Sequence, residues 1–168
     1  MDMSRNLSLP FFSGEHPGEA YYYIPLTYYL FGIVNNSQNY LNVYLLHEGD
    51  GDRGDNNFVS CLVRYMKEKN FFTCPHYGEL TVVADNCNGQ NKNSIVLRYL
   101  MWLVERQIFP KVTLLFLVKG HTKNSCDRLF NCMKLDYNRQ NTYTHHELVQ
   151  CLNQNKKVSV VSMTPSDF

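Results

Sequence analysis

Hydrophobic and polar residues along this chain switch between two periods, and the switch predicts an α/β protein. Residues 21–34 and 40–46 are dense in tyrosine, leucine, isoleucine and phenylalanine, which favours strands. The polar residues 35–39 between them predict a hairpin turn. Pro25 marks an edge or a bend in the first of these strands. A shorter strand before them carries Asp2, so three antiparallel strands open the chain.

Helical periodicity begins after an acidic loop. From about Asn57 to Lys69, apolar residues recur at spacings of three and four, which is typical of an amphipathic helix. Residues 80–84 form a short strand-like run. Residues 94–107 are apolar nearly all round, which predicts a buried helix, and residues 111–119 predict a strand buried on both faces.

Capping residues mark the last two helices. Ser125 is a suitable N-cap for a helix that carries Asp127 in its first turn. Thr144 and Glu147 fit a capping box that opens a short final helix. Residues 158–163 then predict the last strand.

The order of these elements predicts one domain over residues 1–168, with an α/β fold whose mixed sheet of five to six strands has helices on both faces. Hydrophobic residues make up 44% of the chain and charged residues 18%, which excludes wholesale disorder. The formal net charge is +1, so any surface that binds phosphate has to be a local patch. No apolar run is long enough to cross a bilayer, and no membrane partner is expected.

Cysteine and histidine placement argues against a zinc site. The six cysteines contain no CxxC pair, and no secretory leader precedes them, which indicates reduced, mostly buried thiols in an intracellular protein. Cys74 and His76 lack a second pair at ligand spacing. His145 and His146 are adjacent on a predicted helix and point apart, so we expect both at the surface.

One stretch, residues 80–93, carries the candidate chemistry. The strand-like run 80–84 leads directly into Asp85, and eight small or polar residues follow. In α/β folds, a strand that ends on an acid and opens into a polar loop presents catalytic or metal-binding groups. The alternative is that Asp85 caps the next turn.

The order of strands allows three acids to meet. If the strand of Asp2 lies beside the strand that ends at Asp85, Asp127 can approach both from its helix. Three converging carboxylates repel one another unless cations lie among them, and two divalent ions bridged by carboxylates are suited to phosphodiester chemistry. Taken singly, Asp127 is explained by the helix dipole and Asp2 by a frayed terminus.

The motifs around these acids resemble the RNase H-like superfamily of transposases, integrases and nucleases, and more narrowly a transposon-derived eukaryotic domain family. That family carries a D-x-C-x-G-Q-N-K-N segment followed by G-H-[ST]-x4-D, which correspond to residues 85–93 and 120–127. Arg53-Gly54, residues 59–62, and Asp2 with residues 7–10 also match. The resemblance spans nearly the whole chain and implies an RNase H-like fold.

The resemblance implies metal-dependent cleavage or strand transfer at nucleic-acid phosphodiester bonds. Asp2, Asp85 and Asp127 would be the catalytic and metal-binding acids, with Mg²⁺ or Mn²⁺ as the cofactor. His121 would carry protons or contact phosphate beside the metal ions, the alternative being a buried histidine bonded to backbone. The expected partner is DNA or RNA, in a nuclear protein that forms homo-oligomers. The residues expected to contact nucleic acid are Gln90, Asn91, Lys92, Lys119, Lys123 and Arg128.

Two departures from that family's motifs leave open whether this chain is an enzyme. Asn57 stands where the family has a glutamate, and Asp2 lies almost at the start of the chain, which suggests a fragment of a longer protein. The rival function is therefore a domesticated, catalytically silent domain that binds nucleic acid or a protein. A 3′–5′ exonuclease fits less well, because His121 and Asp127 are one residue too far apart for its H-x4-D motif.

Overall fold

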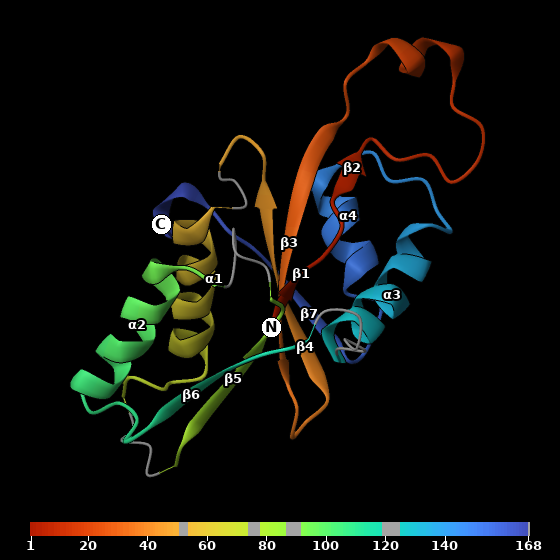
Figure 1. Cartoon of the computed structure of the whole chain (residues 1–168). Helices are drawn as coiled ribbons and strands as arrows, with labels where there is room; N and C mark the ends of the chain where they lie inside the picture. The colour runs from red at the N-terminus through yellow and green to blue at the C-terminus, as the bar shows by residue number, and fades with distance from the viewer. Residues whose placement is uncertain (51–53, 74–77, 87–91, 119–124, 168) are drawn as a thin grey trace.

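An antiparallel hairpin, β3 (Leu26–Asn35) and β4 (Tyr40–His47), organises the fold (Figure 1). The computed structural model describes residues 1–50, 54–73, 78–86, 92–118 and 125–167. Two short strands, β1 (Asp2–Met3) and β2 (Leu7–Leu9), lie end to end along the free edge of β3 and are antiparallel to it. On the far side, β7 (Val158–Ser162) runs parallel to β4. The result is a mixed five-stranded sheet.

Two further strands, β5 (Leu80–Ala84) and β6 (Val112–Phe116), pair with each other in parallel as a separate ladder. One hydrogen bond of 2.6 Å, from the Met1 amino group to the Val83 carbonyl oxygen, links β5 to the larger sheet beside β1. The predicted mixed sheet of five to six strands is present as the five-stranded sheet, and β5 and β6 form a second ladder in contact with it. The link is narrow because β1 is two residues long.

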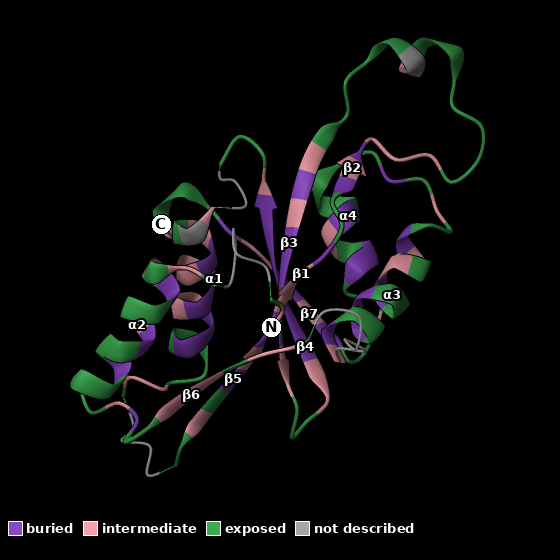
Figure 2. Cartoon of the chain, viewed as in Figure 1, coloured by how far each residue is buried: buried purple, intermediate pink, exposed green. Residues whose placement is uncertain are grey.

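Four helices of the described part of the chain lie on the two sides of the sheets. α1 (Asp55–Glu68) and α2 (Ser94–Glu105) lie on one side, and α3 (Ser125–Tyr137) and α4 (His145–Leu152) on the other (Figure 1). Alternating residues of the hairpin enter two separate apolar clusters. Phe31 packs toward α1, whereas Leu30 packs toward α3. Buried residues accordingly occupy both faces of the central strands (Figure 2). Helices on both faces of a mixed sheet were predicted, and this is confirmed.

The start of β3 differs from the prediction of a strand over residues 21–34. A short 3₁₀ helix, η1 (Gly18–Tyr22), is followed by an exposed segment, and pairing begins at Leu26, directly after Pro25. Ile24 is 94% exposed, in an arm that projects from the body (Figure 2). The aromatic composition of residues 21–25 favours a strand, but β2 pairs with β3 only from Leu26 onward.

Two elements are less buried than predicted. α2 buries Val96, Leu100 and Leu103 but exposes Leu97 and Met101, so it is not buried all round. β6 is partly exposed along its whole length, with Leu115 49% exposed, because α2 covers one of its faces and α3 and α4 lie against the other sheet. The predicted strand buried on both faces was wrong.

The predicted start of α4 is confirmed, and the predicted start of α3 is not. The predicted capping box is present: the Thr144 hydroxyl accepts a hydrogen bond from the Glu147 N–H, and the Glu147 carboxylate accepts one from the Thr144 N–H. Ser125 is the first residue of α3 rather than its N-cap. His145 and His146 are both exposed, as predicted.

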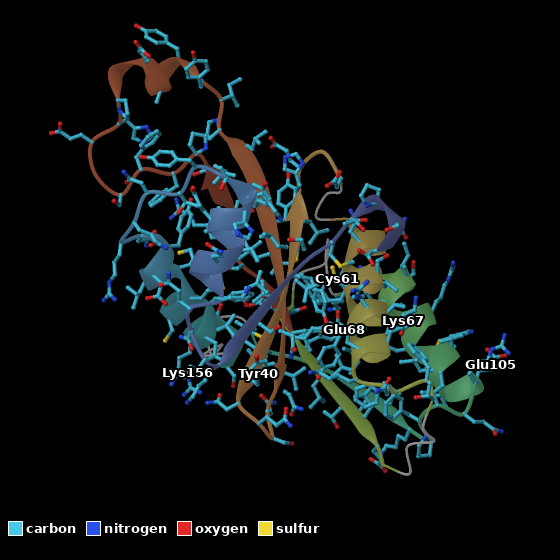
Figure 3. All side chains as sticks on the ribbon, turned by 180° about the vertical axis from the view of Figure 1, so that it is seen from behind. Tyr40, Cys61, Lys67, Glu68, Glu105 and Lys156 are labelled. Carbon is cyan, nitrogen blue, oxygen red and sulfur yellow. The ribbon has the colours of Figure 1, made fainter. Side chains whose placement is uncertain are left out.

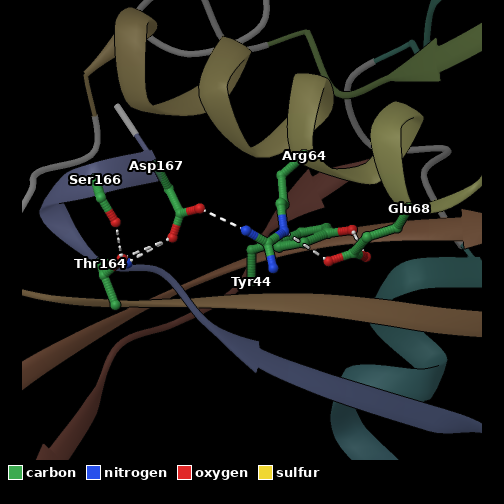
Figure 4. A network of polar contacts seen from close by, with 6 residues as sticks. All are labelled: Tyr44, Arg64, Glu68, Thr164, Ser166 and Asp167. Atoms are coloured by element: carbon green, nitrogen blue, oxygen red, sulfur yellow. Dashed lines mark hydrogen bonds and ion pairs between the residues drawn. The ribbon is translucent and has the colours of Figure 1, made fainter. Parts of the chain in front are cut away.

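A polar network ties the end of the chain to α1 and β4 (Figure 4). Arg64 donates hydrogen bonds to Glu68 at 2.9 Å and to Asp167 of the 3₁₀ helix η2 (Pro165–Asp167) at 2.6 Å. The buried Tyr44 hydroxyl donates to Glu68 at 2.8 Å. Cys61 and Glu68 both project from α1 toward the sheet (Figure 3), so this helix is held by apolar packing and by the network together.

The cysteines that the structure describes are free thiols, three of them buried: Cys61, Cys126 and Cys151, with Cys132 exposed. This confirms the prediction of mostly buried cysteines for that part of the chain. Within the described residues, the longest apolar helix falls short of what a membrane crossing requires.

Candidate active site

Asp2 lies at the centre of the molecule, on β1, where the chain begins (Figure 1). It is half-buried and pairs across the sheet with Gly32 of β3. Its Oδ1 accepts a hydrogen bond of 2.8 Å from the Met3 N–H. Met1 and Met3 pack into the cluster beneath α1, so the side chain of Asp2, between them, points to the face that carries α3.

Asp85 directly follows β5, as the sequence predicted. The strand forms because residues 80–84 are β-prone and because β6 pairs with all five of them. The ladder extends one step further, with the Leu117 N–H donating to the Ala84 carbonyl oxygen at 3.0 Å. Asp85 is half-buried, and its Oδ1 accepts a hydrogen bond of 2.7 Å from the Asn86 N–H. The carboxylate therefore lies at the point where the strand ends.

Asp127 lies in the first turn of α3, on its exposed side. The opposite side of this helix is apolar, and Cys126, Phe130 and Met133 anchor it against the sheet. The anchor is close because Gly32 has no side chain: a Cβ at that position would collide with the ring of Phe130. Gly32 therefore brings the start of α3 down onto the strand that pairs with Asp2.

Asp127 and Asp85 both act on Asp2 electrostatically. Burial, then the charge of Asp127, then the charge of Asp85 raise the pKa of Asp2 to about 6, against the lowering effect of its hydrogen bond from Met3. Salt screens exposed charges that are further apart than about a Debye length. Asp127 and Asp85 therefore both lie near Asp2. The three elements thus bring Asp2, Asp85 and Asp127 into one region.

This region is not a ready-made metal site. Among the residues that the structure describes, no three histidine, cysteine, aspartate or glutamate side chains are placed so that they could hold one metal ion. Asp2 and Asp85 each direct one oxygen to the amide that follows in the chain. The donor chemistry suits a hard divalent ion, since all three groups are carboxylates. Coordination by all three would require their side chains to turn.

A family model for a domain of unknown function, DUF7869, matches residues 21–165. The chain belongs to the DUF7869 family. Asp85 and Asp127 lie inside the matched region, and Asp2 lies before it. No curated protein and no solved structure matches the chain.

Two of the basic residues predicted to contact nucleic acid are described in this DUF7869 domain, and both are exposed. The Lys92 ammonium lies 5.7 Å from the ring centroid of Phe116, and the Arg128 guanidinium donates to the Asn39 side chain at 3.2 Å. Arg128 follows Asp127 directly on the exposed side of α3, and its side chain reaches Asn39, which follows β3. The other predicted residues, Gln90, Asn91, Lys119, His121 and Lys123, lie outside the described residues.

Two residues near the acids were missed from the sequence. Gly32 was treated as part of a strand, although a glycine within a strand can mark a close backbone approach. Cys126 was treated as an ordinary buried thiol, but its Sγ donates to the Gly32 carbonyl oxygen at 3.7 Å. Burial raises the pKa of Cys126, and the charge of Asp2 adds to the effect. Sequence spacing alone does not reveal that Gly32 and Cys126 contact each other.

Proposed function

We propose that this DUF7869 domain is a transposon-derived, divalent-metal-dependent nuclease or strand transferase that acts on nucleic-acid phosphodiester bonds through Asp2, Asp85 and Asp127. The observation that carries the proposal is the electrostatic effect of Asp127 and Asp85 on Asp2. These residues are more than 40 positions apart in the chain, and they come from a strand, from the residue that follows another strand, and from a helix. Carboxylates held close in spite of their repulsion are typical of a site that binds cations.

The arrangement of elements favours an RNase H-like fold for the domain. An antiparallel ladder of β1, β3 and β4 is followed by the parallel pair β5 and β6, with β5 beside β1. Helices lie on both faces. One acid on the first strand, one at the end of β5 and one at the start of a later helix agree with the acid placement that the sequence motifs suggested.

Asp2, Asp85 and Asp127 would hold Mg²⁺ or Mn²⁺, since oxygen donors suit these ions. A bound divalent ion supplies an activated water or 3′-hydroxyl and stabilises the leaving oxygen. The chain's own residues would position the substrate: Lys92, over the Phe116 ring at the end of β6, and Arg128 of α3 would offer exposed cations to phosphate. Such a substrate, DNA or RNA, implies a nuclear location.

A catalytically silent binding domain of the same fold is the second candidate. It is favoured by the lack, among the described residues, of three side chains placed to hold a metal ion. Asn57, in the first turn of α1, is a neutral amide where the resembling family has a glutamate. In that case Lys92 and Arg128 would serve binding alone.

A nicking assay on supercoiled DNA separates the two candidates. The wild type, Asp127→Asn and Asp136→Asn are compared in Mg²⁺ and in Mn²⁺. Asp136 is the matched control because it lies on the same helix, α3, and forms an ion pair with Arg139 away from the other acids. The nuclease proposal expects nicking by the wild type and Asp136→Asn, and none by Asp127→Asn. Equal nicking by all three, or none under either ion, would overturn it.

A further inference from the structure

A cavity of ≈ 470 Å³ lies beside β1, between β3 and β5. Its walls come from the end of β3 and the turn after it (33–37) and from residues 80–83 of β5. Met1 closes one end. The cavity therefore lies in line with β1, on the side from which the chain enters that strand.

Beside Met1 the gap has the width of one strand, and it widens beyond, where β5 diverges from the hairpin (Figure 1). β1 pairs with β3 on one side and reaches β5 through Met1 on the other, so β3 and β5 stand two strand spacings apart there, roughly 9.6 Å. Among the described residues, no backbone hydrogen bond joins β3 directly to β5. Beside Met1, a helix, about 10–12 Å across with its side chains, is too wide for this space.

Backbone groups of both strands face into the gap. On β3, the Leu30 carbonyl oxygen accepts from the Ser4 N–H toward β1, so the alternation of a strand turns Val34 to the same side. On β5, the Val83 carbonyl oxygen accepts from Met1, so Thr81 also faces the gap. Leu80 faces the other way, because its N–H donates to the Lys111 carbonyl oxygen.

The two faces of the gap differ in chemistry. Toward α1 it is lined by apolar side chains that belong to one core cluster: Ile33, Leu62, Tyr65, Met66, Leu80 and Val82. Toward α3 it is lined by smaller side chains, apolar and polar together: Val34, Thr81, Val83, Ser125 and Cys126. A strand placed here would need apolar residues at every second position and small or polar residues between them.

We propose that this gap binds an extended peptide segment with alternating apolar and polar residues, antiparallel to β3 and parallel to β5. Beside Met1 the segment continues the backbone pairing of β1 with β3, and from there it follows the free edge of β5. Its apolar side chains fill the space beneath α1. Because residues 80–83 line the cavity, about four residues, or roughly 13 Å of strand, fill it. Addition of a strand to exposed backbone edges is an established mode of peptide recognition. This proposal does not rest on the proposed nuclease activity.

The test uses the full chain and three fluorescein-labelled, amidated hexapeptides. The first alternates threonine and valine. The second has the same sequence with N-methyl groups on its two central amides, which removes backbone donors but keeps the side chains. The third has the same composition in two blocks, three threonines and then three valines. Anisotropy titrations give the three dissociation constants.

Amide hydrogen exchange supplies an internal control within β5. The Thr81 and Val83 amides face the gap, whereas the Val82 amide faces β6. With free peptide at about ten times its dissociation constant, we expect exchange at Thr81 and Val83 to slow roughly tenfold, with Val82 unchanged. We also expect the N-methylated and block peptides to bind at least about tenfold more weakly than the alternating peptide.

Equal binding of the alternating and N-methylated peptides would overturn the proposal, since the cavity would then be an apolar pocket without strand pairing. So would the absence of binding at about 1 mM peptide. Equal slowing at Thr81, Val82 and Val83 would also overturn it, because general stabilisation protects both edges of β5.

Discussion

Asp2 of β1 lies directly opposite Gly32 of β3, and Gly32 is also the point where the ring of Phe130 from α3 meets the sheet. Gly32 therefore pairs with Asp2, and it also sets how closely α3, which carries Asp127, lies to the sheet. Cys126, next to Asp127, completes the contact by donating to the Gly32 carbonyl oxygen. The relative position of Asp2 and Asp127 thus depends on a backbone position that bears no side chain.

Gly32→Ala is expected to destabilise the fold by about 1–3 kcal/mol, because the added methyl group overlaps the Phe130 ring and also contacts Leu41. α3 has to move away from β3, which moves Asp127 away from Asp2. Urea denaturation measures the loss of stability.

Gly14→Ala is the matched control, since a Cβ at Gly14 meets no atom within 4 Å. It is expected to change the free energy of unfolding by less than about 0.5 kcal/mol. If Gly32→Ala were no more destabilising than Gly14→Ala, the close approach of α3 would not depend on Gly32.

The spacing of apolar residues along the chain predicted those elements that bury one clear face or one apolar run. β5 and α1 lie where their apolar residues indicated, because each packs one clear face or run into a core. Residues 21–25 are as aromatic as a strand, but pairing with β2 starts at Leu26, so composition alone placed the strand too early. The exposure of Met101 on α2 was likewise invisible, because a sequence shows an apolar face but not whether another element covers it.

The candidate site was predicted in part for the same reason. Asp85 follows from a strand that ends in a polar loop, a local signal. The neighbourhood of Asp2 and Asp127 depends on contacts between residues about 100 positions apart, through Gly32 and Phe130. No local pattern encodes such a contact. The motif resemblance suggested the same three acids, without indicating what holds them together.

Asp2→Asn is expected to stabilise the metal-free protein at pH 8. Burial and the charges of Asp127 and Asp85 raise the pKa of Asp2 to about 6 in the folded state, above its ordinary value of 3.8. The folded state therefore binds the proton more tightly than the unfolded state, and the wild type carries a penalty above about pH 6 that is relieved as the pH falls toward 4. Asparagine removes the charge and keeps an oxygen for the Met3 N–H.

Allowing for the partial exposure of Asp2, the gain is on the order of 1 kcal/mol at pH 8, or about 2–4 °C in Tm. The measurement is thermal unfolding of both proteins in EDTA from pH 4 to pH 8. The difference between them is expected to shrink to zero near pH 4. A difference that grows as the pH falls would contradict the raised pKa.

Mn²⁺ is expected to raise the Tm of the wild type and not that of Asp85→Asn. Cations relieve the repulsion among the three acids, and binding to the folded state alone stabilises it, by about 1.4 kcal/mol at ten times the dissociation constant. This corresponds to a rise of about 3–5 °C. Glu105→Gln, on α2, is the control and is expected to respond as the wild type does. If Mn²⁺ has no effect and Asp85→Asn lowers the Tm by itself, Asp85 is a structural residue.

Asn57→Glu is expected to raise nicking activity in Mg²⁺, roughly ten- to hundredfold, the scale on which groups that support a metal site act. The motivation is that two-ion chemistry needs both ions held, and a missing carboxylate weakens one of them. Asn57 is half-buried in the first turn of α1, whereas its neighbour Asn56 is exposed.

Asn56→Glu is therefore a sharp control, because it adds the same charge to the same helix turn and the same favourable interaction with the helix dipole. Its nicking rate is expected to equal that of the wild type. Mn²⁺ is expected to rescue the wild type more than it helps Asn57→Glu, because its coordination is less strict than that of Mg²⁺.

Robust wild-type nicking in Mg²⁺ that Asp85→Asn abolishes would show that the loss of a carboxylate at position 57 does not reduce activity. Equal rates for Asn56→Glu and Asn57→Glu would place residue 57 outside the metal site, and inactivity of every variant under both ions would favour the binding-only domain.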